Sequence, residues 1–220
     1  MTTASETDAV FVMADLSGFS ALTEAHGSLR AADLIGRYME IVRAVLEPGV
    51  RFLERVGDQV VLVADDAAPA ITTAIRLREA VEREPLFPMV RIGLNGGPVV
   101  ERGGEYFGAA LNLTARVTAH ARPGQILCTE PVAARARELH DVQICNLGSV
   151  KFKNVAEPVP VFELLCRDGL DATATIDPVC RMRVDLETAA ARVLYKDAHR
   201  YFCSLECAKT FLEKPEAYPR

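Results

Sequence analysis

The sequence lacks several features that mark whole classes of protein. No cluster of Lys or Arg stands out along its 220 residues, and the formal net charge is −5, so neither a nucleic-acid partner nor an anionic membrane surface is expected. No apolar run approaches the length of a membrane span, and the polar segment 1–8 lacks the basic and apolar regions of a secretory signal. Internal repeats and low-complexity tracts are also absent. We therefore expect a soluble, cytoplasmic protein.

The composition allows one substantial core and a small second unit, because half of the residues are hydrophobic in a chain of this length. Of the six cysteines, three are scattered through strand-like segments, whereas Cys180, Cys203 and Cys207 crowd the C-terminal end. In a reducing cytoplasm, such a cluster indicates metal or redox chemistry.

The hydrophobic periodicity predicts an α+β sandwich in which helices cover one face of a mainly antiparallel sheet. Residues 1–8 are expected to be disordered, and the charged, small residues 167–176 are expected to link this sandwich to a unit at 177–220. Helices are predicted at 29–46, 69–81, 109–117 and 131–139, and strands at 10–16, 51–56, 59–64, 89–95, 125–128, 142–147 and 159–165.

Two carboxylates interrupt apolar segments. Asp15 lies in the apolar run 11–19, and Asp58 lies in the tight turn between two predicted strands. An acid in such a strand is costly unless it is paired, hydrogen-bonded or bound to a metal. Each acid alone could simply cap a turn, but two on neighbouring strands suit Mg²⁺ or Mn²⁺, which prefer oxygen ligands.

Asn112 and Arg116 are four residues apart in a predicted helix, so both side chains should lie on one helix face. The alternative for Arg116 is a surface salt bridge.

Several motifs in order resemble the class III nucleotidyl cyclases over residues 9–166. They are Asp-x-x-Gly-Phe at 15–19, the turn at Gly57-Asp58, the segments 91–97 and 106–108, Asn112-x-x-x-Arg116, and the segments 123–127 and 152–159. The resemblance implies a ferredoxin-like cyclase sandwich and a homodimer. It also implies conversion of ATP or GTP into a 3′,5′-cyclic nucleotide and pyrophosphate in intracellular signalling.

The same resemblance implies roles for single residues. Asp15 and Asp58 would bind two Mg²⁺ or Mn²⁺ ions per active site, facing Asn112 and Arg116 of the other protomer. Asn112 would orient the ribose, and Arg116 would stabilise charge on the α-phosphate. Nucleotide binding would further involve Gly18, Phe19, Glu54, Glu105 and Lys153, with Lys151 as an alternative to Lys153.

The residues at the base-recognition positions point in two directions. Glu54 stands where adenylyl cyclases usually have Lys and leans toward guanine, whose N1–H and amino group are donors. Glu105 stands where they usually have Asp and can accept from the adenine amino group. The choice between ATP and GTP therefore stays open, and an alternative is a catalytically weak or inactive nucleotide sensor.

Residues 177–218 resemble a YHS domain, which is related to treble-clef metal-binding modules, through Asp177-Pro178-Val179-Cys180, Tyr201-Phe202-Cys203 and Cys207. Three thiolates suit zinc or copper at an open site, with Met182 or His199 as a fourth ligand. The alternative is a set of buried thiols that only pack in a core. The other histidines, His26, His120 and His140, have no partners at ligand spacing. On a third hypothesis, this unit is a metal carrier and the rest a dimerising platform.

Overall fold

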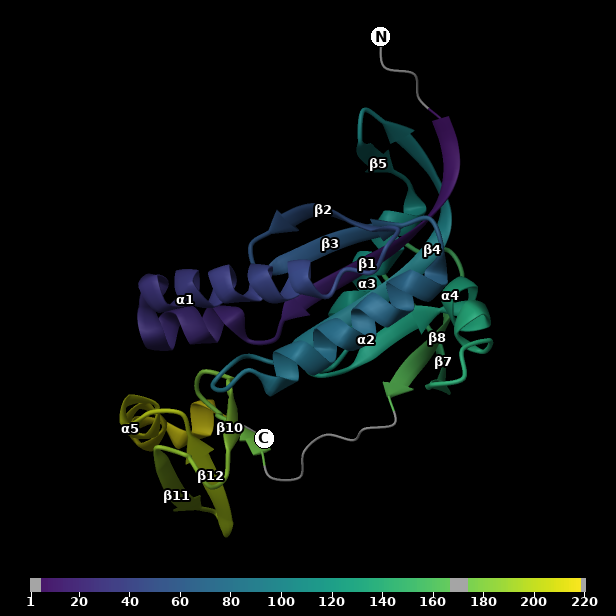
Figure 1. Ribbon diagram of the computed structural model, residues 1–220. Coiled ribbons are helices and arrows are strands. Elements are labelled where there is room, and N and C mark those ends of the chain that lie inside the picture. Colours follow the sequence, from purple (N-terminus) through teal and green to yellow (C-terminus); the bar gives the residue numbers. More distant parts are fainter. Residues whose placement is uncertain (1–4, 167–173, 219–220) are drawn as a thin grey trace.

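The computed structural model describes residues 5–166 and 174–218 (Figure 1). The helices are α1 (Phe19–Ala44), α2 (Ala67–Arg83), α3 (Ala109–His120), α4 (Glu130–Ala136), α5 (Leu205–Glu213) and the short 3₁₀ helix η1 (Pro215–Ala217). The strands of the main sheet are β1 (Ser5–Leu16), β2 (Val50–Val56), β3 (Gln59–Ala64), β4 (Val90–Arg102), β5 (Glu105–Phe107), β6 (Ile126–Thr129), β7 (Val142–Val150) and β8 (Val159–Cys166). None of the described helices is long and apolar enough to span a membrane.

The sheet runs in the order β2-β3-β1-β4-β6-β8-β7, and β5 pairs with β4. All of its pairs are antiparallel except β4 with β6. The α+β class and the mainly antiparallel sheet are thus confirmed. At its centre, β1 pairs with both β3 and β4, so residues near the end of β1 lie beside the β2–β3 turn.

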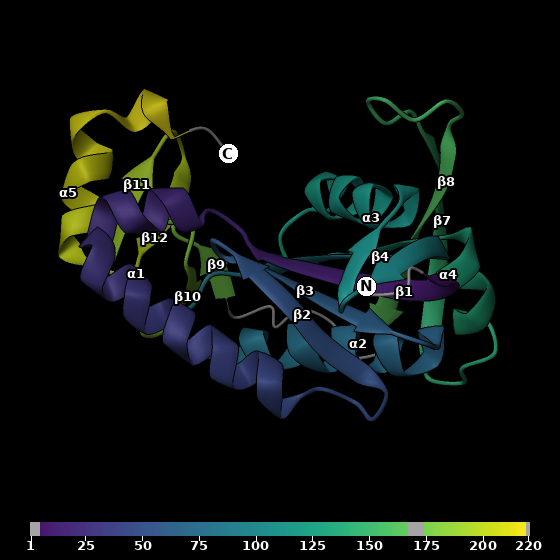
Figure 2. The same ribbon diagram turned by 90° about the horizontal axis from the view of Figure 1, so that it is seen from above.

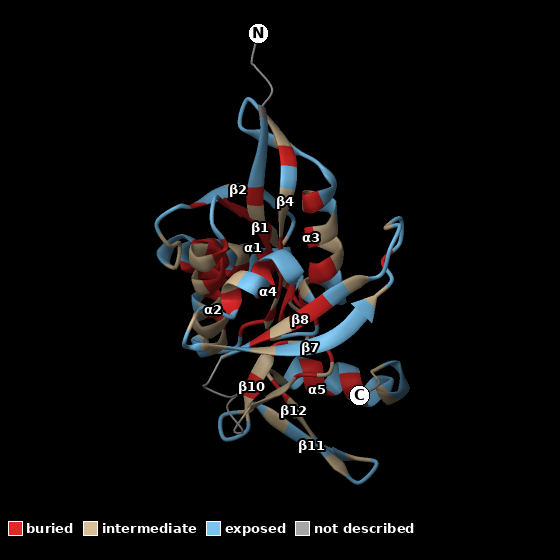
Figure 3. Cartoon of the chain, turned by 90° about the vertical axis from the view of Figure 1, so that its right-hand side faces the viewer, coloured by how far each residue is buried: buried red, intermediate tan, exposed pale blue. Residues whose placement is uncertain are grey.

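One face of the sheet packs against α1, α2 and α4, and it carries the larger apolar core. Alternate residues of β1, namely Val12, Ala14 and Leu16, point into this core. The N-terminus of α2 is capped by Asp66, whose carboxylate accepts the N–H of Ala68 at 2.8 Å. Figure 3 shows the buried residues concentrated between these helices and the sheet, while the edge strand β7 is largely exposed.

The prediction that the helices cover only one face is wrong for α3, which lies on the opposite face (Figure 2). Its buried residues include Ala110, Thr114 and Val117, at the spacing of one helix stripe. The close approach depends on Gly93 of β4, because a Cβ there would lie 2.3 to 2.8 Å from Thr118 atoms. A strand residue without a side chain lets the helix backbone rest on the sheet.

Several predicted boundaries shift. The strand β1 begins at Ser5, within the segment 1–8 that was expected to be disordered, because β4 is long enough to pair with it as far as Glu101. The α1 helix begins at Phe19, ten residues before the predicted start, and Gly27 (φ 80°, ψ 164°) breaks it into two segments. That break hides the helical period of the first segment.

The C-terminal unit consists of β9 (Ala174–Ile176) paired with β10 (Arg183–Asp185), β11 (Ala191–Tyr195) paired with β12 (Ala198–Phe202), and α5 with η1. Of the predicted linker, 174–176 therefore form a strand, and 167–173 lie outside the described residues.

This C-terminal unit packs directly on the larger unit. The N–H of Arg183 donates to the carbonyl of Phe87 at 3.0 Å, and Met182 forms a bridge with Pro88. Val179, Phe202 and Phe211 join the same apolar cluster as α1 and α2. The two units thus share one continuous core.

Candidate active site

The structure brings Asp15 and Asp58 together. Asp15 lies near the end of β1 and Asp58 in the turn between β2 and β3, and the pairing of Ala14 with Val60 sets the two carboxylates side by side. The alternation along β1 places Asp15 on the same face as Phe11, which packs in the cluster beneath α3. The carboxylate pair therefore lies on the α3 face of the sheet.

Charge in this pair is only partly compensated. Asp15 accepts hydrogen bonds from Arg91 Nε at 2.7 Å and pairs with its Nη2 at 2.6 Å. Burial and then the neighbouring Asp15 carboxylate raise the pKa of Asp58 to about 6, with Arg91 acting in the opposite direction. A cation placed between the two acids would relieve this repulsion, so these hard oxygen donors fit Mg²⁺ or Mn²⁺.

Tyr38 holds the backbone of β1 next to the Asp15–Asp58 carboxylate pair. Its buried hydroxyl donates to the carbonyl of Ala14 at 3.2 Å. Burial first, and then the charges of Asp15 and Asp58, raise the pKa of Tyr38 well above its ordinary value. The hydroxyl therefore stays protonated and holds β1 at the residue before Asp15.

The loop from Asp15 to Phe19 turns sharply beside this pair. The N–H of Ser17 donates to the carbonyl of Met89 at 2.8 Å, and Gly18 has φ 80°. In the described part of the chain, the buried Ser17 hydroxyl has no hydrogen-bond partner. Because Gly18 has no side chain to cap α1, the first-turn amides of this helix lack a side-chain acceptor.

Asn112 and Arg116 lie on one face of α3 as their spacing predicts, and both line a cleft of about 720 Å³. The same two side chains border a second hollow of about 420 Å³ next to Phe152. Arg116 forms no ion pair within residues 5–166 and 174–218, so the surface salt bridge considered for it is not seen. The first cleft is also lined by residues of β4, α3, α4 and the loop before β8, namely Asn95, Gly96, Gly97, Pro98, Ala109, Ala110, Leu113, Pro131, Asn154, Val155 and Ala156.

Asn95 positions α3, a role that the sequence did not reveal. Its buried side-chain amide donates to the carbonyl of Ala110 at 2.9 Å, and its oxygen accepts from the Thr129 hydroxyl at 2.6 Å. A buried amide must have such partners. The available signal was an uncharged polar residue at the end of the segment 89–95, which is apolar apart from Arg91 and Gly93.

The two candidate phosphate lysines differ in their surroundings. The Lys151 ammonium group bonds to the carbonyl of Ala156. Lys153 is exposed, and its neighbours Phe152 and Asn154 line the two hollows. Lys153 is therefore better placed to meet a ligand in the cleft.

Glu54 and Glu105 are exposed on β2 and β5, respectively. These strands are joined by Arg51, whose guanidinium donates to the Tyr106 hydroxyl at 3.2 Å and also pairs with Asp65 at 3.2 Å. Arg51 was not expected to have such a role. It fixes the strand residues near both acids without touching either carboxylate.

The carboxylate pair and the α3 pair form two separate halves. Within the described residues, no hydrogen bond or ion pair connects Asp15 or Asp58 with Asn112 or Arg116. Each half nevertheless lies on the α3 face of the sheet.

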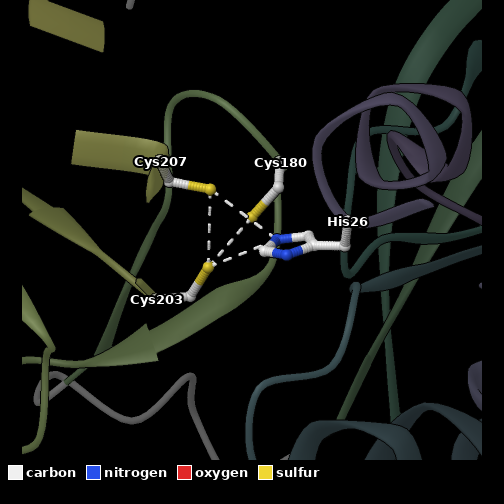
Figure 4. A group of neighbouring side chains, drawn as sticks. All are labelled: His26, Cys180, Cys203 and Cys207. Atoms are coloured by element: carbon white, nitrogen blue, oxygen red, sulfur yellow. Dashed lines mark hydrogen bonds between the residues drawn. The ribbon is translucent and has the colours of Figure 1, made fainter. Parts of the chain in front are cut away.

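A second cluster lies where the C-terminal unit meets α1. Cys180, Cys203 and Cys207 gather as expected, but the fourth member is His26, so the expectation that His26 has no partners is wrong. Met182 instead is buried in the core, and His199 packs beside Tyr201 with 6.4 Å between ring centroids. Figure 4 shows the His26 ring pointing from α1 toward the three thiols.

Comparison with known proteins agrees with this architecture, although no family model matches the chain. The chain is 39% identical over 119 residues to a pH-sensitive adenylate cyclase of Mycobacterium tuberculosis. The aligned segment covers 54% of this chain and 30% of that protein. The crystal structure of the adenylyl cyclase CyaB from P. aeruginosa matches with a TM-score of 0.68 and 18% identity, covering 77% of this chain and 100% of the other. The guanylyl cyclase Cya2 matches with a TM-score of 0.67 and 21% identity, covering 78% and 96%.

These likenesses define the fold as that of the class III adenylyl/guanylyl cyclase catalytic domain. The named relative from Mycobacterium tuberculosis is itself described as an adenylate cyclase. The chain spans about a third of the length of the curated relatives that it matches. The resemblance of residues 177–218 to a YHS domain stays a prediction.

Proposed function

We propose that the protein converts ATP or GTP into the 3′,5′-cyclic nucleotide and pyrophosphate at a site shared by two copies of the chain. The observation that carries this proposal is the Asp15–Asp58 pair, two adjacent carboxylates of which Asp58 has a raised pKa, on the same face of the sheet as the cleft with Asn112 and Arg116. In the reaction, the ribose 3′-hydroxyl loses its proton and bonds to the α-phosphorus. The bond from this phosphorus to the bridging oxygen of pyrophosphate breaks.

Asp15 and Asp58 would hold two Mg²⁺ or Mn²⁺ ions. When bound, these cations supply Lewis acidity toward the triphosphate and the attacking hydroxyl. Arg91 holds the Asp15 carboxylate in place through its two contacts with Oδ2. The protein's part is thus to present two adjacent carboxylates in fixed positions.

Arg116 and Asn112 act on the nucleotide from α3. The Arg116 guanidinium is always charged and presents a planar set of donors, so it can stabilise the negative charge that develops on the α-phosphate. Asn112, one turn earlier on the same helix face, offers both a donor and an acceptor to the ribose. Asn95 holds the first turn of this helix and thereby sets where both side chains lie.

Phosphate oxygens would also meet the loop at Gly18 and Phe19 and the ammonium group of Lys153. A helix N-terminus without a side-chain cap offers backbone N–H groups to anions. The buried, unpartnered Ser17 hydroxyl adds a donor at the same loop. Lys153 is exposed beside the cleft, whereas Lys151 is bonded to a backbone carbonyl.

Two copies are needed because one chain holds the two halves apart. In a two-fold dimer, the Asp15–Asp58 half of one protomer faces the Asn112–Arg116 half of its partner, and the symmetry repeats this arrangement once. Such a composite site makes dimerisation a requirement for activity.

The experiment measures product formation with Mn²⁺ and either ATP or GTP. We expect Asp15→Asn to abolish turnover and Asp33→Asn, at an exposed position of α1, to leave it unchanged. Asp58→Ala and Arg116→Ala should each be inactive alone and regain partial activity when mixed, because one of the two sites then keeps all of its residues. No recovery on mixing would contradict a shared site.

A second candidate function is a nucleotide sensor, which the presence of both Glu54 and Glu105 at the base-recognition positions favours. Glu54 suits the donors of guanine and Glu105 suits the amino group of adenine, so neither base satisfies both acids. Nucleotide binding without turnover would support the sensor. Turnover of one triphosphate would also decide which acid reads the base.

A further inference from the structure

His26 links the two units of the chain at the thiol cluster. It is the last residue before the break at Gly27, so its ring projects sideways from the first segment of α1. Its Nε2 lies 3.6 Å from Cys203 Sγ and 3.6 Å from Cys207 Sγ (Figure 4). The cluster therefore draws one member from the cyclase-like fold and three from the C-terminal unit.

A buried carboxylate holds the cysteine backbones in place. Asp177 is fully buried, and its Oδ1 accepts the N–H groups of Val179 at 2.8 Å and Cys180 at 3.3 Å. Its Oδ2 accepts the N–H of Cys203 at 2.8 Å. Ser204 caps α5 by accepting the N–H of Cys207 at 3.1 Å. Such outer contacts are what preorganises a metal site.

The spacing of the four ligand atoms matches one tetrahedral zinc ion. Bonds of about 2.3 Å to sulfur and about 2.0 Å to nitrogen place neighbouring sulfurs about 3.8 Å apart and sulfur and nitrogen about 3.5 Å apart. The sulfur separations are 3.3 Å for Cys180 with Cys203 and 3.7 Å for Cys203 with Cys207. All three thiols are free, and all four ligand atoms lie within 4.8 Å of one another.

We propose that His26, Cys180, Cys203 and Cys207 bind one Zn²⁺ ion that fastens the C-terminal unit to α1. Four protein ligands make a closed structural site, in contrast to the open site expected from three cysteines. The ion is a cross-link between residues more than 150 positions apart in the sequence.

The cross-link fixes a contact at the loop beside the carboxylate pair. Arg181 follows the ligand Cys180 and packs against Gly18, where an added Cβ would lie 2.4 Å from Arg181 Cβ and 2.5 Å from its Cγ. Holding Cys180 therefore holds Arg181 on the backbone of Gly18. The bearing of this contact on catalysis rests on the proposed function, because only that function makes Gly18 part of a phosphate-binding loop.

The test measures the affinity of the full chain for Zn²⁺, with a chromophoric chelator as competitor and no nucleotide present. We expect one zinc ion per wild-type chain. Loss of an outer-sphere partner costs about 10- to 100-fold in affinity, so His26→Ala, which removes a ligand, should cost about 100-fold or more. His26→Cys should retain tight binding, because four thiolates also form a closed site.

His199→Ala is the matched control, since His199 is an exposed histidine of the same C-terminal unit, and its zinc affinity should equal that of wild type. Because His26 lies outside this unit, its replacement removes no residue of the three-cysteine unit, whereas Cys203→Ser removes one of the three thiols and should also lower the zinc affinity. Wild-type affinity in His26→Ala, or no zinc uptake by the wild-type chain, would overturn the proposal.

Amide hydrogen exchange gives an independent readout of the cross-link. Adding Zn²⁺ should slow exchange in residues 17–27 of the wild-type chain and leave it unchanged in His26→Ala. Equal slowing in both proteins would show that zinc does not act through His26. Neither measurement depends on cyclase activity, so a failure of the proposed function leaves both results interpretable.

Discussion

Gly93→Ala tests whether α3 rests directly on the sheet. The new Cβ would lie 2.3 Å from Thr118 Oγ1, 2.5 Å from Thr118 N and 2.8 Å from Thr118 Cα. Two of these atoms belong to the backbone, so a change of rotamer cannot relieve the clash. Restoring ordinary contact requires α3 to move by roughly 1 Å, and such overpacking costs about 1–3 kcal/mol, of which we expect the upper end.

Thermal unfolding measures this cost. For a chain of this size, about 3 kcal/mol corresponds to a fall in Tm of roughly 6–12 °C. Activity is a second readout, because Asn112 and Arg116 move with α3, and a misplacement of about 1 Å can cost about 100-fold in rate. Thr118→Ala added to Gly93→Ala should restore only part of the stability, since it removes Oγ1 and leaves the backbone contacts.

Gly36→Ala is the matched control, because Gly36 lies in α1 and, beyond its own helix turn, no atom of the described residues lies within 4 Å of an added Cβ. This substitution should stabilise the helix by about 0.5–1 kcal/mol. If Gly93→Ala has the stability of wild type while Gly36→Ala behaves as expected, then α3 does not pack on β4 in the way described, and the placement of the Asn112–Arg116 half is wrong.

Three further substitutions test single contacts. Tyr38→Phe should destabilise the fold by about 1 kcal/mol, because the carbonyl of Ala14 loses its donor; an unchanged Tm would refute that bond. Asn95→Ala should lower the free energy of unfolding in urea by about 1–3 kcal/mol, since buried groups at the start of α3 lose their partner. Equal unfolding midpoints for the variant and the wild type would show that the amide does not anchor the helix. Lys153→Ala should raise the KM for the triphosphate about 10-fold or more, as expected for a hydrogen bond to a charged group, and Lys151→Ala should leave KM near its original value; the opposite ranking would reassign the lysine.

Most helices and strands of the fold can be predicted from local sequence patterns. Helix α3 was predicted within three residues of its observed end, because its apolar stripe and the flanking Gly108 and Pro123 are short-range signals. The four-residue spacing of Asn112 and Arg116 likewise determines their common face in any helix. The recognisable hairpin turn between β2 and β3 located Asp58, whereas its place beside Asp15 depends on the pairing of β1 with β3, which the family resemblance implied.

Which face of the sheet a helix covers is not a local property. An apolar stripe on α3 shows that the helix packs on something, and it is equally compatible with either face. Gly93 determines which face α3 covers, because the missing side chain of this strand residue makes room for a helix on one face only. In the sequence, that glycine is one of several between 93 and 97, so its particular role emerges only with the register of β4 against α3.

The fourth zinc ligand shows how proximity along the chain misleads. His199 precedes Cys203 by four residues, but it lies in β12, which Cys203 directly follows, and four residues of extended chain span about 13 Å. Bonds of about 2 Å to one ion cannot bridge that distance. A ligand must instead approach from outside the hairpin. The first segment of α1 supplies it, since the break at Gly27 ends this segment with His26 directed at the three thiols.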